Sequence, residues 1–225
     1  MTQQRALDTR AGLVDAAATE FTQHGYAGGS VNRMLDVAAC TKGAMYFHFA
    51  SKRALADAVL DAAEQAYSAV GQRRPTTGDV HPIEAIAQMV DDAADLYEHN
   101  LRVQAASRLT LEPDFVDRDP TKGWVDAVAG HAARLAESGC LVDGFTADRF
   151  ARALATMLAG QRYLARIVPI GDTESISSRY SESLDIVLTA AVSQRSHEWR
   201  MPAAVGDTDR HRSGPTAAET TYAGR

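Results

Sequence analysis

The chain has 225 residues, of which 45% are hydrophobic, enough for two small domains with buried cores. It has no run of about 18 apolar residues and no apolar signal segment at its start, so we expect no membrane association and a cytoplasmic location. The net charge of −6 argues against a nucleic-acid partner if it is spread evenly, but it is not. Residues 1–53 carry six basic and four acidic side chains, a net charge of +2, so the remainder carries −8.

Three helices are expected in the first fifty residues. Apolar residues repeat at helical spacing from about residue 8 to 24, and Gly25 should end this helix because glycine accepts left-handed backbone angles. Ser30 is placed to cap a second helix over about 31–38, and Thr41 a third over 41–47. The core between them should consist of Phe21, Met34, Leu35, Met45 and Phe49. The pattern predicts a helix-turn-helix unit whose last helix can enter a major groove.

The third helix carries small residues and hydrogen-bond donors on its expected outer face, a set that suits DNA better than a protein core. We expect Lys42 at a base edge or phosphate and Gly43 at a close approach of the backbone to DNA. Phosphate contacts are expected from nearby side chains and helix N-termini. The predicted DNA-binding residues are Ser30, Arg33, Thr41, Lys42, Gly43, Tyr46, His48 and Lys52.

Six further helices are expected after Ser51. Their approximate ranges are 52–71, 82–99, 101–111, 121–138, 146–168 and 173–199, with a loop over 112–120. The sequence indicates no strands. From residue 203 onward no apolar period survives, so we interpret 203–225 as a disordered tail. The last two long helices are expected to pair with their copies in a homodimer.

The region over 51–202 is large enough to enclose a cavity for a small-molecule inducer. Candidate ligand residues are polar, aromatic or flexible side chains on otherwise apolar helix faces: Gln65, Tyr97, Gln104, Trp124, Met157 and Gln161. Two of these have ordinary structural explanations that stay open. Gln161 could instead hydrogen-bond to a neighbouring helix, and Trp124 could instead be a core residue.

An enzyme is the main competing interpretation. Asp91, Asp92 and Asp95 lie close together in the sequence, and His99 and His131 could serve acid–base chemistry or metal binding. No metal-binding histidine pair, phosphate-binding loop or nucleophile elbow occurs, so a solvated acidic face is the better explanation. We therefore expect no catalysis, no cofactor and no metal. A DNA-binding structural protein without any ligand is a further alternative.

The first sixty residues resemble a known family of DNA-binding proteins. The string Thr41-Lys42-Gly43-Ala44-Met45-Tyr46-Phe47-His48-Phe49 followed by Ser51-Lys52-Arg53-Ala54-Leu55 is similar to the N-terminal domain of TetR-family transcriptional regulators. One departure is Ala39, where the family usually has glycine in the turn. A positive φ there would cost alanine about 1 kcal/mol.

The resemblance implies an all-α protein with a DNA-binding domain over 1–50 and a ligand-binding and dimerisation domain over 51–202. Two features of the chain are similar to the γ-butyrolactone receptor branch: a tryptophan that opens the seventh helix, and the segment Leu55-Ala56-Asp57-Ala58-Val59-Leu60. In that branch the tryptophan lines the signal pocket, and members repress antibiotic genes. The resemblance therefore implies a repressor released from a palindromic operator by a γ-butyrolactone, butenolide or furan. The alternative is a regulator of an efflux or metabolic gene that responds to a drug or lipid.

Overall fold

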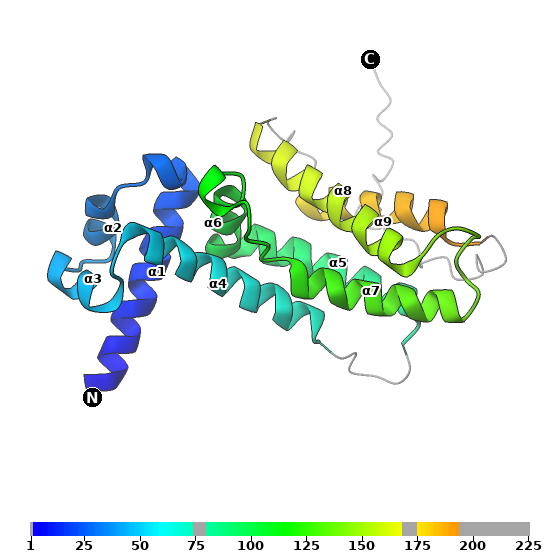
Figure 1. Ribbon diagram of the computed structural model, residues 1–225, viewed down its shortest axis with the longest axis horizontal. Helices are drawn as coiled ribbons and strands as arrows, with labels where there is room; N and C mark the ends of the chain where they lie inside the picture. The colour runs from blue at the N-terminus through cyan, green and yellow to red at the C-terminus, as the bar shows by residue number, and fades with distance from the viewer. Residues whose placement is uncertain (1, 74–79, 168–174, 194–225) are drawn as a thin grey trace, which may run out of the picture.

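The computed structural model describes residues 2–73, 80–167 and 175–193, and these form an elongated, all-helical molecule (Figure 1). Within these ranges there are nine α-helices and one 3-10 helix. None of these helices is long and apolar enough to cross a membrane. Their bounds are α1 Thr2–Gly28, α2 Val31–Val37, α3 Lys42–His48, α4 Lys52–Gly71, α5 Pro82–His99, α6 Leu101–Leu109, η1 Pro113–Phe115, α7 Lys122–Glu137, α8 Ala147–Ile167 and α9 Ile176–Ala191.

Helices α1, α2 and α3 form the predicted helix-turn-helix unit at one end of the molecule (Figure 1). The five residues expected in its core are all buried: Phe21, Met34, Leu35, Met45 and Phe49. Apolar burial is the main favourable term for so small a unit, and it fixes which face of α3 points inward. The opposite face of α3 is therefore left on the outside.

Three polar side chains begin the helices as the sequence predicts. Ser30 accepts a hydrogen bond from the backbone N–H of Arg33 at the start of α2, and Thr41 accepts one from Ala44 at the start of α3. Ser51 does the same for the N–H of Ala54 in α4. Each cap satisfies a backbone donor that has no partner within its own helix.

The long first helix turns sharply at Gly25, as predicted. Gly25 has a φ of 69° and a ψ of −175°, which places it outside helical geometry within α1. Only glycine adopts this conformation without strain. The chain then makes a short helical segment up to Gly28 before entering α2.

The remaining helices form a second body around a continuous core. Helix α4 contacts α1, α6 and α7, and α5 contacts α7 and α9. Helix α8 packs between α7 and α9, so these three lie along one side of the molecule (Figure 1). Helix α6 is short and lies against α1, which joins the second body to the helix-turn-helix unit.

Three elements differ from the sequence prediction. Helix α1 begins at Thr2 rather than near residue 8. Helix α9 ends at Ala191 rather than continuing to residue 199, because Val192 is extended and forms an isolated bridge with Leu141. The N–H of Ser193 then donates to the carbonyl of Cys140. Helix α6 ends at Leu109, and the expected loop after it contains the short helix η1. The predicted tail over 203–225 lies outside the described residues.

The turn of the helix-turn-helix unit carries the strain expected from its sequence. Ala39 has a φ of 46°, the only positive φ at a non-glycine residue in the described ranges. An L-residue with a Cβ atom pays about 1–2 kcal/mol in this region.

Ala39→Gly should therefore raise the free energy of unfolding by about 0.5–1 kcal/mol, after allowing for the greater freedom of glycine in the unfolded chain. Chemical denaturation of both proteins measures the change. Ala38→Gly is the matched control, because Ala38 has a φ of −76° and gains nothing from glycine. Its stability should fall, and a gain of equal size in both variants would contradict the strain at Ala39.

Candidate DNA-binding surface and ligand cavity

The outward face of α3 is open and polar. Thr41, Lys42 and Gly43 are exposed, and Tyr46 is 52% exposed on the same short helix. A Cβ atom added to Gly43 would meet no other atom within 4 Å, so the backbone there is free to approach a partner closely. His48 is half-buried at the C-terminal end. The structure thus brings five of the eight predicted DNA-binding residues together on one exposed helix, where their DNA contacts stay a prediction.

Phe47 is a feature of this face that sequence reasoning missed. Its side chain is 81% exposed, the most of any large apolar side chain in the described residues, and its ring lies edge-on to His48 with centroids 5.0 Å apart. The spacing of Met45 and Phe49 was a signal for the exposure of Phe47. These two residues lie four apart on the buried side of α3, so the residue midway between them faces away from the core. An exposed aromatic ring suits contact with a thymine methyl group.

The other three predicted DNA residues are engaged within the protein. The Nε of Arg33 donates to both carboxylate oxygens of Glu20, at 2.9 and 3.1 Å, and one terminal nitrogen donates to the carbonyl of Gly28. The backbone N–H of Ser30 also donates to Glu20, at 2.8 Å. Lys52 lies 4.8 Å from the ring centre of Tyr26. The side chains of Arg33 and Lys52 and the backbone of Ser30 thus link α2 and α4 to α1, which the sequence did not predict.

The buried carboxylate of Glu20 makes this arrangement sensitive to acid. Hydrogen bonds from Arg33 are the main cause that holds the pKa of Glu20 below its usual value of 4.5, although burial opposes the shift. Glu20 therefore stays ionised in the folded protein at a pH where the unfolded chain takes up a proton. Its contribution to stability is complete above about pH 4.5 and is lost as the pH falls through the folded pKa.

Glu20→Gln should lower the free energy of unfolding by about 1–3 kcal/mol at neutral pH, because Gln cannot form the charged pair with Arg33. The difference from the wild type should shrink at an acid pH well below 4.5, because the contribution of the ion pair is lost as folded Glu20 takes up a proton. Denaturant unfolding at both pH values measures it. A difference that is constant with pH would show that the ion pair does not contribute in this way.

The second body contains a cavity of about 580 Å³ between α6, α7 and α8. This volume lies within the range of small-molecule sites in proteins. Much of its wall is small and apolar, made by Ala106, Val125, Ala129, Ala151, Ala155 and Ala159. Its charged lining residues are Arg118, Arg152, Arg162, Arg166, Asp119, Asp126 and Asp148.

Trp124 belongs to the core and lines a small inner hollow next to this cavity. It is 3% exposed, and its indole N–H donates to the carbonyl of Met89 at 3.1 Å. With Tyr67 and Arg162 it lines a small hollow of about 10 Å³ that shares five lining residues with the main cavity. Trp124 therefore presents only its apolar ring to the hollow, since its polar atom is already used.

None of the six predicted ligand residues lines the main cavity, and of the six only Trp124 lines the hollow beside it. Gln65 is exposed, and Tyr97 is half-buried outside the lining. Gln104 donates to the carbonyls of Tyr97 and Glu98, which ties α6 to the end of α5.

Gln161 donates to the hydroxyl of Ser183 on α9 at 3.3 Å, which is the structural alternative left open by the sequence. Met157, one turn earlier, packs against the core. Successive residues of a helix point about 100° apart, so the face of α8 that carries these two side chains is turned away from the cavity. The face that lines the cavity carries Arg162 instead.

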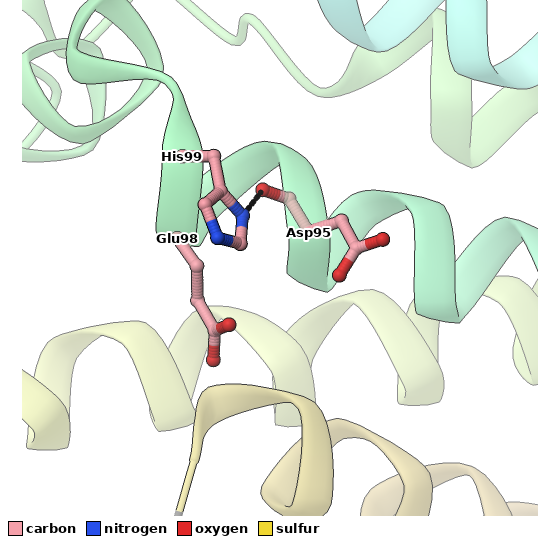
Figure 2. Close-up of side chains that lie close together, drawn as sticks. All are labelled: Asp95, Glu98 and His99. Carbon is pink, nitrogen blue, oxygen red and sulfur yellow. Dashed lines mark hydrogen bonds between the residues drawn. The ribbon is translucent and has the colours of Figure 1, made fainter.

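An exposed acidic cluster lies at the end of α5, where Asp95, Glu98 and His99 come together (Figure 2). A ring nitrogen of His99 is hydrogen-bonded to the carbonyl of Asp95. The carboxylate of Glu98 accepts the N–H groups of Ile176 and Ser177, so it caps the start of α9. The cluster therefore has a structural explanation, and His131 lies apart from it on α7.

Two residues at and after the end of α6, Arg108 and Glu112, hold the end of α1. The carboxylate of Glu112 accepts the backbone N–H groups of Tyr26 and Ala27, directly after Gly25. Arg108 donates to the carbonyls of Thr22 and Gln23, both at 2.9 Å. This joint connects the helix-turn-helix unit to α6 and the residues after it, of which Ala106, Ser107, Thr110 and Leu111 line the cavity.

Replacing Glu112 with Gln should loosen this joint, since an amide offers one acceptor oxygen in place of two. We expect hydrogen exchange at the amides of Tyr26 and Ala27 to become about 10–100 times faster, as for the loss of about 1–3 kcal/mol of local stability. Glu137→Gln is the control, because Glu137 is exposed on α7. Unchanged exchange at both amides in the Glu112 variant would rule out its role in the joint.

Comparison with known proteins identifies the N-terminal unit. Residues 13–59 match the family described as bacterial regulatory proteins, tetR family. The N-terminal unit is thus a TetR-family domain. The chain is 35% identical to the A-factor receptor protein of Streptomyces griseus over 128 residues, which are 56% of this chain and 44% of that relative. The match thus spans less than half of the receptor's length.

Two solved structures extend the likeness to the second body. TylP, a TetR regulator from Streptomyces fradiae, superposes with a TM-score of 0.66 at 27% identity, over 85% of this chain and 90% of that one. A structure described as the molecular basis for control of antibiotic production by bacterial hormones gives a TM-score of 0.70 at 28% identity, over 82% and 98%. A further relative, AcnR of Corynebacterium efficiens, is named as a transcriptional repressor and is 25% identical over 84% of this chain and 95% of that one.

Proposed function

We propose that the protein is a ligand-responsive transcriptional repressor that acts in the cytoplasm, binds a palindromic operator and is released from it by a small signalling molecule. The observation that carries the proposal is α3, a capped helix with its polar face exposed at the end of the molecule. Lys42 and Tyr46 supply phosphate or base contacts there, and Gly43 permits close approach.

A homodimer is the arrangement that such a surface requires. The DNA-binding unit is small and carries a net charge of only +2 over residues 1–53, so one copy offers few phosphate contacts. Two copies related by a two-fold axis place their recognition helices in successive major grooves, about 34–36 Å apart. Leu164 and Ile167 on α8 and Ile186 on α9 are exposed apolar side chains, and we assign them to the subunit interface.

The inducer binds in the cavity between α6, α7 and α8. The likeness to the A-factor receptor protein favours a γ-butyrolactone, butenolide or furan and control of antibiotic or other secondary-metabolite genes. The alternative is an efflux or metabolic regulator that takes a drug or lipid. The two proposals are distinguished by testing which compounds release DNA from the protein. Release by drugs or lipids, but not by butyrolactones, butenolides or furans, would favour the alternative.

The route from ligand to DNA runs through α6. Ser107, Thr110 and Leu111 line the cavity, and Arg108 and Glu112 from the same stretch hold the end of α1. Arg166 also lines the cavity and donates to the carbonyl of Thr22 at 3.4 Å. We consider two conformations that differ in the position of α6. A ligand that binds the cavity more tightly in one of them shifts the population toward it, and the DNA-binding unit moves with α6.

The direct test is selection of DNA sequences by the full-length protein from a random pool, followed by mobility-shift titration of the enriched site. The proposal expects a palindrome with half-sites about one helical turn apart, and a dimer bound per site. Enrichment of no sequence, or of a site without two-fold symmetry, would contradict it.

Lys42→Ala should weaken binding to that site by about 1–3 kcal/mol, because a base or phosphate contact is lost from each subunit. Titration at fixed salt measures the change, and the slope of affinity against salt should fall. Lys122→Ala is the control, since Lys122 is equally exposed but lies on α7, where it pairs with Asp126. Equal losses for both variants would mean that only overall charge matters.

A further inference from the structure

Arg162 is a charged side chain at the cavity that the proposed function does not explain. It lines both the main cavity and the inner hollow beside Trp124. One terminal nitrogen donates to the hydroxyl of Tyr180 at 2.9 Å. Within the described ranges no carboxylate lies within 4.0 Å of its guanidinium, so it has no acidic partner there.

Removing a charged guanidinium from water without an acidic partner costs free energy, and few groups near Arg162 offset this cost. Arginine stays protonated and offers five N–H donors, of which the tyrosine hydroxyl takes one. Burial opposes the charge of Arg162, but the neighbouring hydroxyls of Tyr67, Tyr180 and Tyr97 raise its pKa above the usual value. The charge therefore remains, and a poorly solvated charge is stabilised by an opposite charge.

Tyr67 supplies an independent sign of a missing partner. Its side chain is 2% exposed, and its hydroxyl makes no hydrogen bond within the described part of the chain. Tyr67 lines the same cavity and the same inner hollow as Arg162. Buried hydroxyls are usually hydrogen-bonded, so the unpaired hydroxyl of Tyr67, a residue that lines the cavity, is a candidate partner for a polar group bound there.

The other charges of the cavity are satisfied or exposed. Arg118 pairs with Asp57 and Asp61, and Arg166 donates to a backbone carbonyl. Arg152 is exposed at the mouth of the cavity. The aspartates are similarly accounted for, because Asp119 accepts from Thr121, Asp126 pairs with Lys122 and Asp148 is exposed in the first turn of α8.

We propose that the inducer is an amphipathic carboxylate, whose charged group binds Arg162 and Tyr67 and whose apolar body lies along the alanine-rich wall of the cavity. A carboxylate accepts two N–H groups of a guanidinium at once and can also accept the tyrosine O–H. A neutral lactone would leave the charge of Arg162 unpaired. This inference rests on the proposed function, in which the cavity takes an inducer, and it narrows the inducers named there to compounds that carry a carboxylate.

The experiment compares two fluorescent probes with one aromatic skeleton. 1-Anilinonaphthalene-8-sulfonate is anionic, and N-phenyl-1-naphthylamine lacks the sulfonate and is neutral. We expect the full-length protein to bind the anionic probe at one site per chain, at least about tenfold more tightly than the neutral one. Decanoate should displace it, and decanamide should not.

Two variants locate the site. Arg162→Gln should weaken binding of the anionic probe by about tenfold or more and leave the neutral probe unchanged. Tyr67→Phe should weaken it about threefold to tenfold, and this variant folds normally because its hydroxyl has no partner to lose. Arg149→Gln is the matched control, since it removes a charge from the same helix outside the cavity and should bind as the wild type does.

Equal affinity of the wild type for both probes would overturn the inference, and so would unchanged affinity of both the Arg162 and the Tyr67 variants for the anionic probe. The outcomes that would contradict the proposed function differ from those that would contradict this inference. If the charge-dependent binding holds but no DNA site is selected, the repressor proposal falls and the anion site stands. If decanamide and decanoate release selected DNA equally well, the repressor stands and the carboxylate site falls.

Discussion

The DNA-binding unit is positioned by the way the end of α1 is held. Gly25 turns the chain with a positive φ, and the two N–H groups after it point to the carboxylate of Glu112. A Cβ atom at Gly25 would clash with that carboxylate and crowd the guanidinium of Arg108, so the backbone conformation and the close approach both require glycine. The orientation of α2 and α3 relative to the second body depends on this joint, because both helices follow directly from it.

The same joint makes the cavity relevant to DNA binding. Helix α6 has nine residues, and its C-terminal half both lines the cavity and holds α1. A short helix with contacts on both sides moves as a unit, so a change at the cavity wall reaches α1 without passing through a flexible linker. The size of the response is limited by the difference in ligand affinity between the two positions of α6.

The sequence predicted the parts of the fold that depend on neighbouring residues. The caps Ser30, Thr41 and Ser51, the turn at Gly25 and the strain at Ala39 are each set by side chains or backbone within a few positions, and the structure confirms them. The joint could not be predicted, because Tyr26 and Glu112 lie 86 residues apart. The prediction of the cavity-lining residues was wrong for a related reason. Gln161 and Arg162 are adjacent in the sequence, and only the packing of α8 on α9 decides which of them faces the cavity.

The position of Arg162 links the chemistry of the ligand to the movement of the DNA-binding unit. Arg166 lies one helical turn after Arg162 on the same face of α8, and it donates to the carbonyl of Thr22 in α1. A carboxylate bound at Arg162 would therefore place a negative charge within a turn of the contact between α8 and α1. Such a charge attracts Arg166 away from a carbonyl that holds it only weakly, at 3.4 Å. An anionic inducer can act on α1 directly in this way, whereas a neutral one must act through the shape of α6 alone.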